Sequence, residues 1–225
     1  MARVLIIRHH SEDRPGLVGE AFEARGFELD VVMMDAESPT PSAAGYDLLV
    51  VLGSKHAVYD ERIEAAWFGR ELEVLAEADQ LKVPVLGICF GAQALCVHYG
   101  GVVKPSGDPE IGWYKIEPLG ESGIDEGPWF EFHFDHCIPP PHAELWARSP
   151  RAVQAFAIGK NVGVQFHPEV DEVQLAEWFA SGDDNGAREF GLEPADLLAQ
   201  TALETPGARV RTAALVDLFL AHALG

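Results

Sequence analysis

A short apolar run that ends in Gly-x-Cys-x-Gly constrains this chain more than any other sequence feature. Val83–Ile88 is predicted to be a buried strand, and the helix-forming stretch Ala92–Tyr99 follows the motif at once. Gly-x-Ser-x-Gly of this kind marks a nucleophile elbow, where a strand turns sharply into a helix. Gly87 and Gly91 lack the Cβ atoms that would clash in the turn, and the helix N-terminus favours a thiolate at Cys89. The pattern therefore predicts a reactive cysteine at the end of a strand.

A base for this nucleophile is predicted after a second short strand. Val162–Phe166 is apolar, and His167-Pro168-Glu169 follows it directly. Proline favours an extended conformation in the residue before it, and side chains two apart on an extended backbone point to the same side. Glu169 is therefore expected to hold one imidazole nitrogen of His167 while the other nitrogen faces Cys89. This is the nucleophile, base and orienting carboxylate of a catalytic triad.

Together the two motifs resemble the class I glutamine amidotransferase family, and in particular a stand-alone domain similar to the glutaminase domain of GMP synthase. Two weaker segments agree, one with the family's oxyanion loop and one with its His-Gly-Asp stretch. The segments that carry the resemblance are Gly87–Gln93, Gln165–Glu169, Val50–Asp60 and Phe132–Asp135. The likeness runs in order from about Leu48 to Glu169. It implies removal of the side-chain amide of glutamine through a γ-glutamyl thioester.

The resemblance also implies roles for the residues of the site. Cys89 would attack the amide carbon, and His167, oriented by Glu169, would protonate the leaving ammonia and then activate water. The backbone N–H groups of Phe90 and Ser54 would stabilise the oxyanion. In this loop Gly53-Ser54-Lys55 stands where the family has Gly-Gly-Pro. Serine reaches a positive φ less easily than glycine, so the loop geometry is the point at which this chain departs from the family.

Four further residues are expected to contact the substrate by the same resemblance. Gln93, in the elbow helix, matches a family residue that touches the glutamine, and Gly53 belongs to the oxyanion loop. Phe134 and Asp135 would hold the α-amino end of the substrate. Lys55 and His56 add polar side chains near the mouth of the site. The resemblance implies no cofactor.

Charge and cysteine content exclude several classes of protein. A formal charge of −20 argues against nucleic acid or an anionic membrane as a partner, because both carry the same sign. Three cysteines in 225 residues do not make a disulfide framework, which fits a reducing, intracellular setting. The apolar run Val4–Ile7 is followed by Arg8 and is predicted to be a first strand, not a signal peptide. We therefore expect a cytoplasmic protein.

Alternating strands and helices in the first half predict an α/β fold. The pattern favours a mostly parallel open sheet between two helical layers, and residues 1–225 are expected to form one domain. The family resemblance implies the flavodoxin-like version of this three-layer α/β/α architecture. Besides the elbow, the first half is predicted to contain strands at Val4–Ile7, Leu29–Met34 and Asp47–Leu52, a loop at Glu37–Gly45, and helices at Pro15–Arg25 and Asp60–Ala78.

The second half predicts antiparallel strands added to that sheet and then helices that cover it. A polar, irregular segment is expected at Ser181–Glu193. The predicted strands are Trp113–Ile116, Trp129–Phe134, Val153–Ile158 and Val162–Phe166, and the predicted helices are Asp171–Phe179, Leu197–Leu203 and Arg209–Leu224. Ligands of such sheets bind at the carboxyl ends of the strands, where Gly53 and Cys89 both fall.

Several other residues have simpler interpretations. Cys96 and Cys137 are expected in the core. His133 and His136 flank Asp135, but this spacing fits no common zinc signature, so no metal site is predicted. His9 and His10 follow the first strand and are expected to be partly exposed, without a catalytic role. Packing is the expected role of Trp113, Trp129, Trp146 and Trp178.

Three functions remain open from the sequence. The first is a glutamine amidotransferase that acts on glutamine and supplies ammonia to a separate synthetase chain. The chain contains no Gly-x-x-x-x-Gly-Lys-Ser/Thr loop for ATP. The second is a catabolic hydrolase of γ-glutamyl amines or peptides with the same triad. The third is a regulatory or binding module without turnover.

Overall fold

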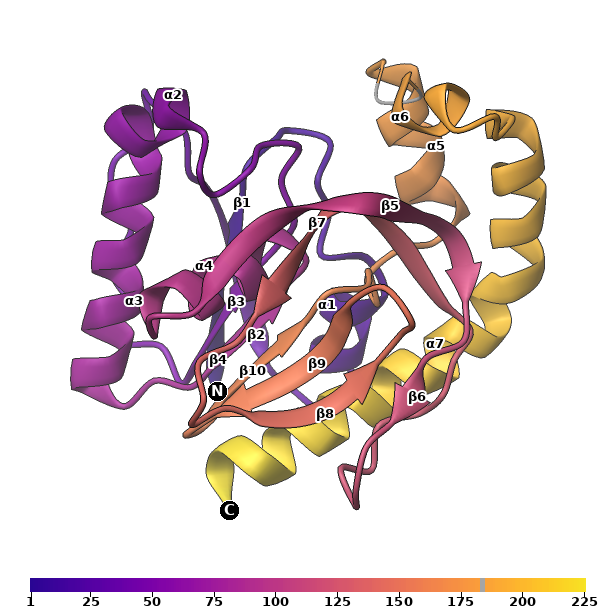
Figure 1. Cartoon of the computed structure of the whole chain (residues 1–225). Coiled ribbons are helices and arrows are strands. Elements are labelled where there is room, and N and C mark those ends of the chain that lie inside the picture. Colours follow the sequence, from indigo (N-terminus) through magenta and orange to yellow (C-terminus); the bar gives the residue numbers. More distant parts are fainter. Residues whose placement is uncertain (183–184) are drawn as a thin grey trace.

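A mostly parallel sheet forms the centre of the molecule (Figure 1). The structure is a computed structural model and describes residues 1–182 and 185–225. The sheet has eight strands in the order β2-β1-β3-β4-β10-β9-β8-β6. Neighbours from β2 to β10 are parallel, and the remaining pairs are antiparallel. The strands of this sheet are β2 (Glu28–Met33), β1 (Arg3–Arg8), β3 (Leu48–Val51), β4 (Val85–Ile88), β10 (Asn161–Val164), β9 (Val153–Ile158), β8 (Glu144–Arg148) and β6 (Glu117–Pro118).

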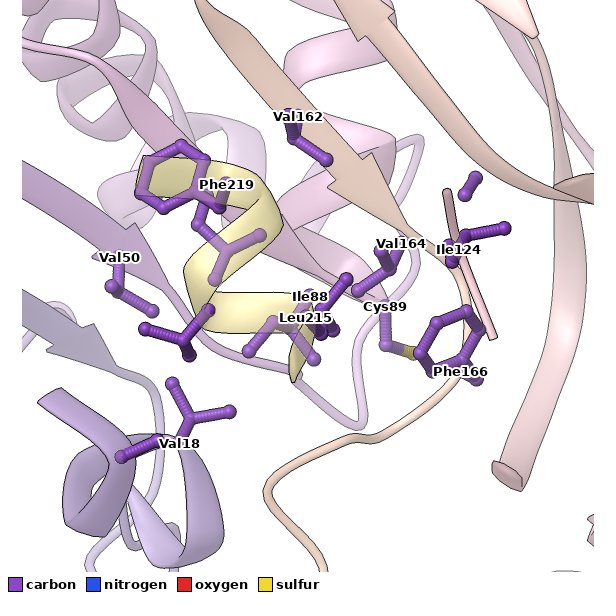
Figure 2. Close-up of a cluster of buried hydrophobic side chains, with 14 of the residues drawn as sticks. Val18, Val50, Ile88, Cys89, Ile124, Val162, Val164, Phe166, Leu215 and Phe219 are labelled. Atoms are coloured by element: carbon purple, nitrogen blue, oxygen red, sulfur yellow. The ribbon is translucent and has the colours of Figure 1, made fainter. Parts of the chain in front are cut away.

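Helices cover both faces of the sheet, because successive side chains of each buried strand point to opposite sides. Val4 and Ile6 of β1 pack in one core cluster with the helices α1 (Gly16–Glu23) and α7 (Pro194–Leu224). Figure 2 shows part of this cluster, with Cys89 among its members. Leu5 and Ile7 lie in the opposite cluster with α3 (Gly69–Leu81) and α4 (Phe90–His98). This three-layer arrangement confirms the predicted α/β fold.

The elbow between β4 and α4 is packed so tightly that glycine is required. A Cβ on Gly91 would lie 2.1 Å from the backbone oxygen of Val51, and a Cβ on Gly87 would lie 2.5 Å from the backbone oxygen of Gly91. Both contacts are with backbone atoms, so they cannot be relieved by a side-chain movement. The two glycines thus allow α4 to begin against the end of β3.

A second sheet corrects the prediction for the middle of the chain. The strands β5 (Val102–Tyr114) and β7 (Trp129–Ile138) pair only with each other in the described residues and are not added to the main sheet. We call this pair the β5–β7 ribbon; Figure 1 shows it passing above the antiparallel strands. The ribbon stands apart because Ile111 and Phe130 pack with Trp178 and Leu197, side chains of two helices, in a core cluster of their own.

The strand after the ribbon also differs from its prediction. Val162–Phe166 is expected among antiparallel additions, but β10 is antiparallel only to β9 and is parallel to β4, with Val164 opposite Ile88. A run of apolar residues does not indicate which strand it will pair with. The structure places β10 between β4 and β9, inside the sheet. This pairing matters for function, because parallel neighbours end at the same edge of the sheet and the residues that follow β4 and β10 emerge there together.

The helical segments agree with the predictions except in their continuity. The predicted helix Asp60–Ala78 consists of α2 (Glu61–Ile63), the π-helix η1 (Glu64–Phe68) and α3, and Ile63, Trp67 and Leu75 are buried. The helix α5 (Glu172–Ala180) is confirmed. Within the predicted irregular segment Ser181–Glu193, α6 (Asn185–Glu189) is helical, and residues 183–184 lie outside the described part.

The C-terminal helix shows that two predicted helices are one. The helix α7 runs from Pro194 to Leu224 with Pro206 inside it, and it bends partway along in Figure 1. An internal proline costs about 3 kcal/mol, but α7 packs along α1 and α5, which outweighs that cost. In the residues that the structure describes, no helix combines the length and the apolar character needed to cross a membrane.

Gly91→Ala tests the packing of the elbow. The added methyl group would collide with the backbone of β3, so we expect the free energy of unfolding to fall by about 2 kcal/mol or more. Urea denaturation measures the change. Gly107→Ala is the matched control, since a Cβ there meets no atom within 4 Å. An equal, small effect of both substitutions would contradict the tight elbow.

Candidate active site

Cys89 occupies the turn of the elbow in a strained backbone conformation. Its φ is 51° and its ψ is −103°, and it immediately precedes the first residue of α4. A positive φ is costly for any residue with a Cβ, and such strain clusters at functional sites. The N–H of Cys89 donates to the carbonyl oxygen of Val164 at 2.8 Å, which ties the turn to β10. Its side chain is largely buried, with its residue 5% exposed.

His167 lies next to Cys89 because β10 is the parallel neighbour of β4. A Cβ built on Gly53 would lie 2.9 Å from Cε1 of His167 and 3.8 Å from Cβ of Cys89, so the two side chains border the same glycine. Nδ1 of His167 is 2.7 Å from Oε1 of Glu169, as the His-Pro-Glu spacing predicts. The structure therefore brings together the three residues of the predicted triad.

The surroundings of His167 favour its charged form. Burial lowers the pKa of the imidazole. The charges of Glu169 and Cys89 and the hydrogen bonds to both groups have the larger, opposite effect, so the pKa lies well above its ordinary value. Glu169 is itself buried and has no place in the cavity wall. Its position behind the ring suits an orienting group rather than one that meets a substrate.

Gln165 is a neighbour of the thiol that the sequence did not identify. Its Nε2 lies 3.6 Å from Sγ of Cys89, and its Oε1 lies 3.3 Å from Nε2 of Gln93. The amide of Gln165 thus links the nucleophile to Gln93, a predicted substrate contact. Gln165 belongs to the Gln-Phe-His-Pro-Glu motif, and its closeness to His167 in that motif is the sequence signal that could have identified it.

A cavity of about 590 Å³ opens in front of Cys89 and His167. All four predicted substrate contacts (Gly53, Gln93, Phe134 and Asp135) line it, as do Ser54, Lys55 and His56. Tyr59 also lines it and donates to Oδ1 of Asp135 at 2.6 Å, across the mouth between the Gly53 loop and β7. Burial and the hydrogen bond to Asp135 raise the pKa of Tyr59 to about 12, so the phenol remains a donor.

The two predicted oxyanion donors occupy suitable backbone positions. Phe90 is the first residue of α4, where N–H groups have no partner within the helix. Ser54 follows Gly53 in the cavity wall, and in the described chain only Lys82 and Cys89 among non-glycine residues have a positive φ. The replacement of glycine by serine therefore requires no left-handed backbone in this loop.

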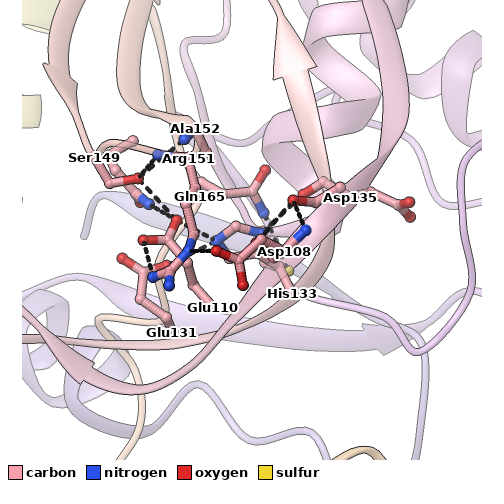
Figure 3. Close-up of polar contacts among 12 residues, drawn as sticks. Asp108, Glu110, Glu131, His133, Asp135, Ser149, Arg151, Ala152 and Gln165 are labelled. Carbon is pink, nitrogen blue, oxygen red and sulfur yellow. Dashed lines mark hydrogen bonds and ion pairs between the residues drawn. The ribbon is translucent and has the colours of Figure 1, made fainter. Parts of the chain in front are cut away.

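His133 forms a buried ion cluster at the edge of the cavity (Figure 3). Its Nε2 lies 3.3 Å from Oε2 of Glu110 and 3.2 Å from Oε2 of Glu131, and Nδ1 donates to the carbonyl oxygen of Asp135 at 2.8 Å. Burial lowers the pKa of His133, but the two nearby carboxylates outweigh it and raise the pKa to about 10. No metal-binding group of three or more His, Cys, Asp or Glu is present in the described residues.

Three other expectations for single residues have clear outcomes. Cys96 and Cys137 are buried, as expected for core cysteines. Trp178 packs, but it also lines the cavity and sets its ring edge-on to His167 at a centroid distance of 5.2 Å. The expectation of partial exposure for His9 is wrong, because its side chain is fully buried against Glu71.

Comparison with protein families gives one clear match. A model described as glutamine amidotransferase class-I matches residues 17–176. A glutamine-hydrolysing GMP synthase subunit from Saccharolobus solfataricus is 33% identical over 155 residues, which is 64% of this chain and 79% of that protein. The corresponding GMP synthase subunit from Sulfurisphaera tokodaii is 33% identical over 156 residues, 65% of this chain and 79% of that protein.

Solved structures agree with the fold along nearly the whole chain. A glutamine amidotransferase from Thermotoga maritima has a TM-score of 0.85 and 26% identity, covering 97% of this chain and 98% of that one. A glutamine amidotransferase from Methylobacillus flagellatus has a TM-score of 0.85 and 23% identity, covering 99% of this chain and 95% of that one. The predicted flavodoxin-like architecture is thereby confirmed.

Raising the pH tests the charge on His133. Because its pKa is raised in the folded protein, its contribution to stability is present below pH 6.5 and is lost as the pH rises toward about 10. Burial likewise raises the pKa of Glu131, which acts in the same direction. We expect ¹⁵N NMR to show His133 still protonated above pH 8, and Glu131→Gln to lower that pKa. Deprotonation of His133 near pH 6.5, as in an exposed histidine, would contradict the ion cluster; Glu126→Gln is the surface control.

Proposed function

Because this chain belongs to the class I glutamine amidotransferase family, we propose that it hydrolyses a γ-glutamyl amide through a thioester on Cys89 and releases ammonia. One observation carries the proposal. Cys89 and His167 come from the carboxyl ends of adjacent parallel strands and border the same glycine in the wall of one cavity. A strained cysteine beside a carboxylate-paired imidazole is the arrangement that nucleophilic catalysis needs.

The first half of the reaction forms the thioester. Sγ of Cys89 attacks the amide carbon of the bound substrate, and the carbonyl oxygen becomes an oxyanion. When the tetrahedral intermediate collapses, the C–N bond breaks and His167 gives its proton to the leaving ammonia. A charged His167, which its surroundings favour, has that proton available at the start.

The second half returns the free enzyme. The now neutral His167 takes a proton from a water molecule, whose oxygen attacks the thioester carbon. The C–S bond breaks and leaves the Cys89 thiolate beside the charged His167, and the released γ-carboxyl group gives its remaining proton to solvent, where ammonia takes one up. Glu169, held 2.7 Å from Nδ1, keeps the imidazole in one orientation through both halves. The oxyanion of each half would be met by the N–H groups of Phe90 and Ser54.

Glutamine is the first candidate substrate, and a separate synthetase chain the candidate ammonia acceptor. The support is the similarity to two subunits of glutamine-hydrolysing GMP synthases, each of which is by name one part of a synthase. In the cavity, Gln93 and Asp135 offer an amide and a carboxylate to the polar end of an amino-acid substrate. A carboxylate suits an α-ammonium group, and Gly53 leaves room beside the thiol.

Cys89→Ala is expected to abolish release of ammonia from glutamine, because the thioester cannot form. Ammonia production is the measurement, and a glutamine-mimicking electrophile followed by mass mapping should place the label on Cys89. Cys96→Ala is the matched control, since that buried cysteine lies outside the cavity wall. Label confined to Cys96 or Cys137, or release from glutamine that survives Cys89→Ala, would sink the proposal.

A hydrolase of larger γ-glutamyl amides is the second candidate, and the size of the cavity favours it. About 590 Å³ is in the range that holds a drug-sized molecule and exceeds the needs of one amino acid. Phe132, Phe134 and Trp178 give the cavity an aromatic wall. An amine substituent on the γ-amide would find apolar surface there, and the same triad would cleave it.

A substrate panel separates the two candidates. If the second is correct, we expect kcat/KM for an aromatic γ-glutamyl amide to exceed that for glutamine by about tenfold or more, as burial of a ring contributes over 1 kcal/mol. Phe134→Ala should lower kcat/KM for the aromatic amide by more than it lowers kcat/KM for glutamine. If glutamine is preferred over every larger amide, the second candidate is rejected and only the first remains.

A further inference from the structure

A buried histidine–glutamate pair lies directly behind the predicted oxyanion loop. Nδ1 of His9 is 2.8 Å from the carbonyl oxygen of Gly53, and Nε2 is 2.7 Å from Oε2 of Glu71. Neither side chain has exposed surface. His9 follows β1 and Glu71 belongs to α3, so the pair joins the end of the sheet to a covering helix through the loop.

The partners of His9 determine which ring atoms carry protons. A carbonyl oxygen only accepts, so Nδ1 must donate to Gly53, while Nε2 faces a carboxylate. Burial lowers the pKa of His9, but the charge and the hydrogen bond of Glu71 and the bond to Gly53 raise it above the ordinary value. With a proton on each nitrogen the ring can donate to both partners, and loss of the carbonyl contact would leave the buried Nδ1–H without an acceptor.

Aromatic packing fixes the ring in this position. The His9 ring stacks on Trp67 at a centroid distance of 4.9 Å and meets Phe90 edge-on at 4.9 Å. Trp67 comes from the π-helix η1, a type of turn that is frequent near functional sites. The imidazole packs against two aromatic rings of the core, and these contacts set its direction toward Gly53.

The contact between His9 and the Gly53 carbonyl also determines the direction of the Ser54 N–H, because both groups belong to one planar peptide. In a trans peptide the C=O of one residue and the N–H of the next point in opposite directions. Since the carbonyl of Gly53 points at His9, the N–H of Ser54 points away from it. His167 and Cys89 lie on the side where a Cβ on Gly53 would point, and Ser54 lines the cavity.

We propose that His9 and Glu71 are positioning residues that hold the Gly53–Ser54 peptide with the Ser54 N–H turned toward the oxyanion formed at Cys89. The inference rests on the proposed function and deepens it, because it concerns a peptide that must be ordered before the substrate arrives. Gly53 accepts many backbone conformations, so without the carbonyl contact this peptide could rotate. The histidine–glutamate pair removes that freedom, and we call this hold of His9 and Glu71 on the Gly53 carbonyl the lock.

A double substitution tests the lock without leaving a buried charge. Removing only one partner would leave an unpaired ion in the core and could unfold the protein. His9→Phe with Glu71→Leu replaces the pair by apolar groups, and a phenyl ring suits the packing against Trp67 and Phe90. We expect a folded protein in which kcat falls by about 100-fold or more while KM changes little, as for loss of an oxyanion donor.

A second readout distinguishes positioning from general damage to the site. Iodoacetamide alkylates a thiol by displacement at a saturated carbon, so that reaction forms no oxyanion. Alkylation of Cys89 in the double variant should keep the wild-type rate, while hydrolysis falls. A crystal structure of the variant should show the Gly53–Ser54 peptide rotated or in more than one orientation.

Two single variants complete the comparison. Glu71→Gln can donate from its amide to Nε2 of a neutral His9, whose Nδ1 still donates to Gly53; activity should fall less than about tenfold. Asn161→Ala is the control for loss of a buried polar contact, since its side chain accepts from the N–H of Val85, at the opposite end of β4 from Cys89. That variant should keep the wild-type kcat.

The outcomes separate this inference from the function on which it rests. Wild-type kcat in the folded double variant, or an unchanged peptide in its structure, overturns the lock and leaves the thioester chemistry standing. Equal losses in hydrolysis and alkylation also overturn it, because they indicate damage to the thiol. Absence of Cys89-dependent hydrolysis in the wild type rejects the function and the lock together.

Discussion

The parallel pairing of β10 with β4 is the contact on which the rest of the site depends. It sets Val164 opposite Ile88, and the bond from the Cys89 N–H to the Val164 carbonyl continues the pairing into the elbow. Parallel strands end at the same edge, so residues far apart in sequence emerge together there. A one-residue shift of register would turn the side chains of β10 to the other face and move His167 away from the thiol.

The elbow supplies a second constraint, because it must be tight and still carry a side chain at a positive φ. Gly87 and Gly91 approach other backbone atoms so closely that no Cβ fits, and this packing holds Cys89 in its strained conformation. Strain of this kind persists only where the surroundings determine the backbone. The same closeness sets Gly91 of α4 against Val51, two residues before Gly53, so the nucleophile lies beside the Gly53 loop.

The sequence predicts the parts of this structure that depend on local pattern. Glycines around Cys89 and the proline after His167 act within a few residues, and the contact between His167 and Glu169 follows from their spacing. The pairing of segments that lie far apart in the sequence has no comparable local pattern. The apolar run of β10 does not name its partner, and the β5–β7 ribbon has its own core because of contacts with helices later in the chain. Pro206 lies in the gap between the predicted helices Leu197–Leu203 and Arg209–Leu224, yet α7 is continuous there and packs along two helices. Glu71 lies 62 residues from His9, so no local pattern could have joined them.

Two buried ion groups on either side of the cavity have a common physical consequence. Desolvated charges contribute little net stability, and burying them is tolerated only when each has its partners in place. The His9–Glu71 pair engages the carbonyl of Gly53, and the His133 cluster engages the carbonyl of Asp135, so each fixes backbone that lines the cavity. A carbonyl bound to a buried imidazole cannot turn away without leaving a ring N–H in the core without an acceptor. The site is thus held rigid from two directions before a substrate binds, which is the condition under which fixed N–H groups stabilise a developing oxyanion most effectively.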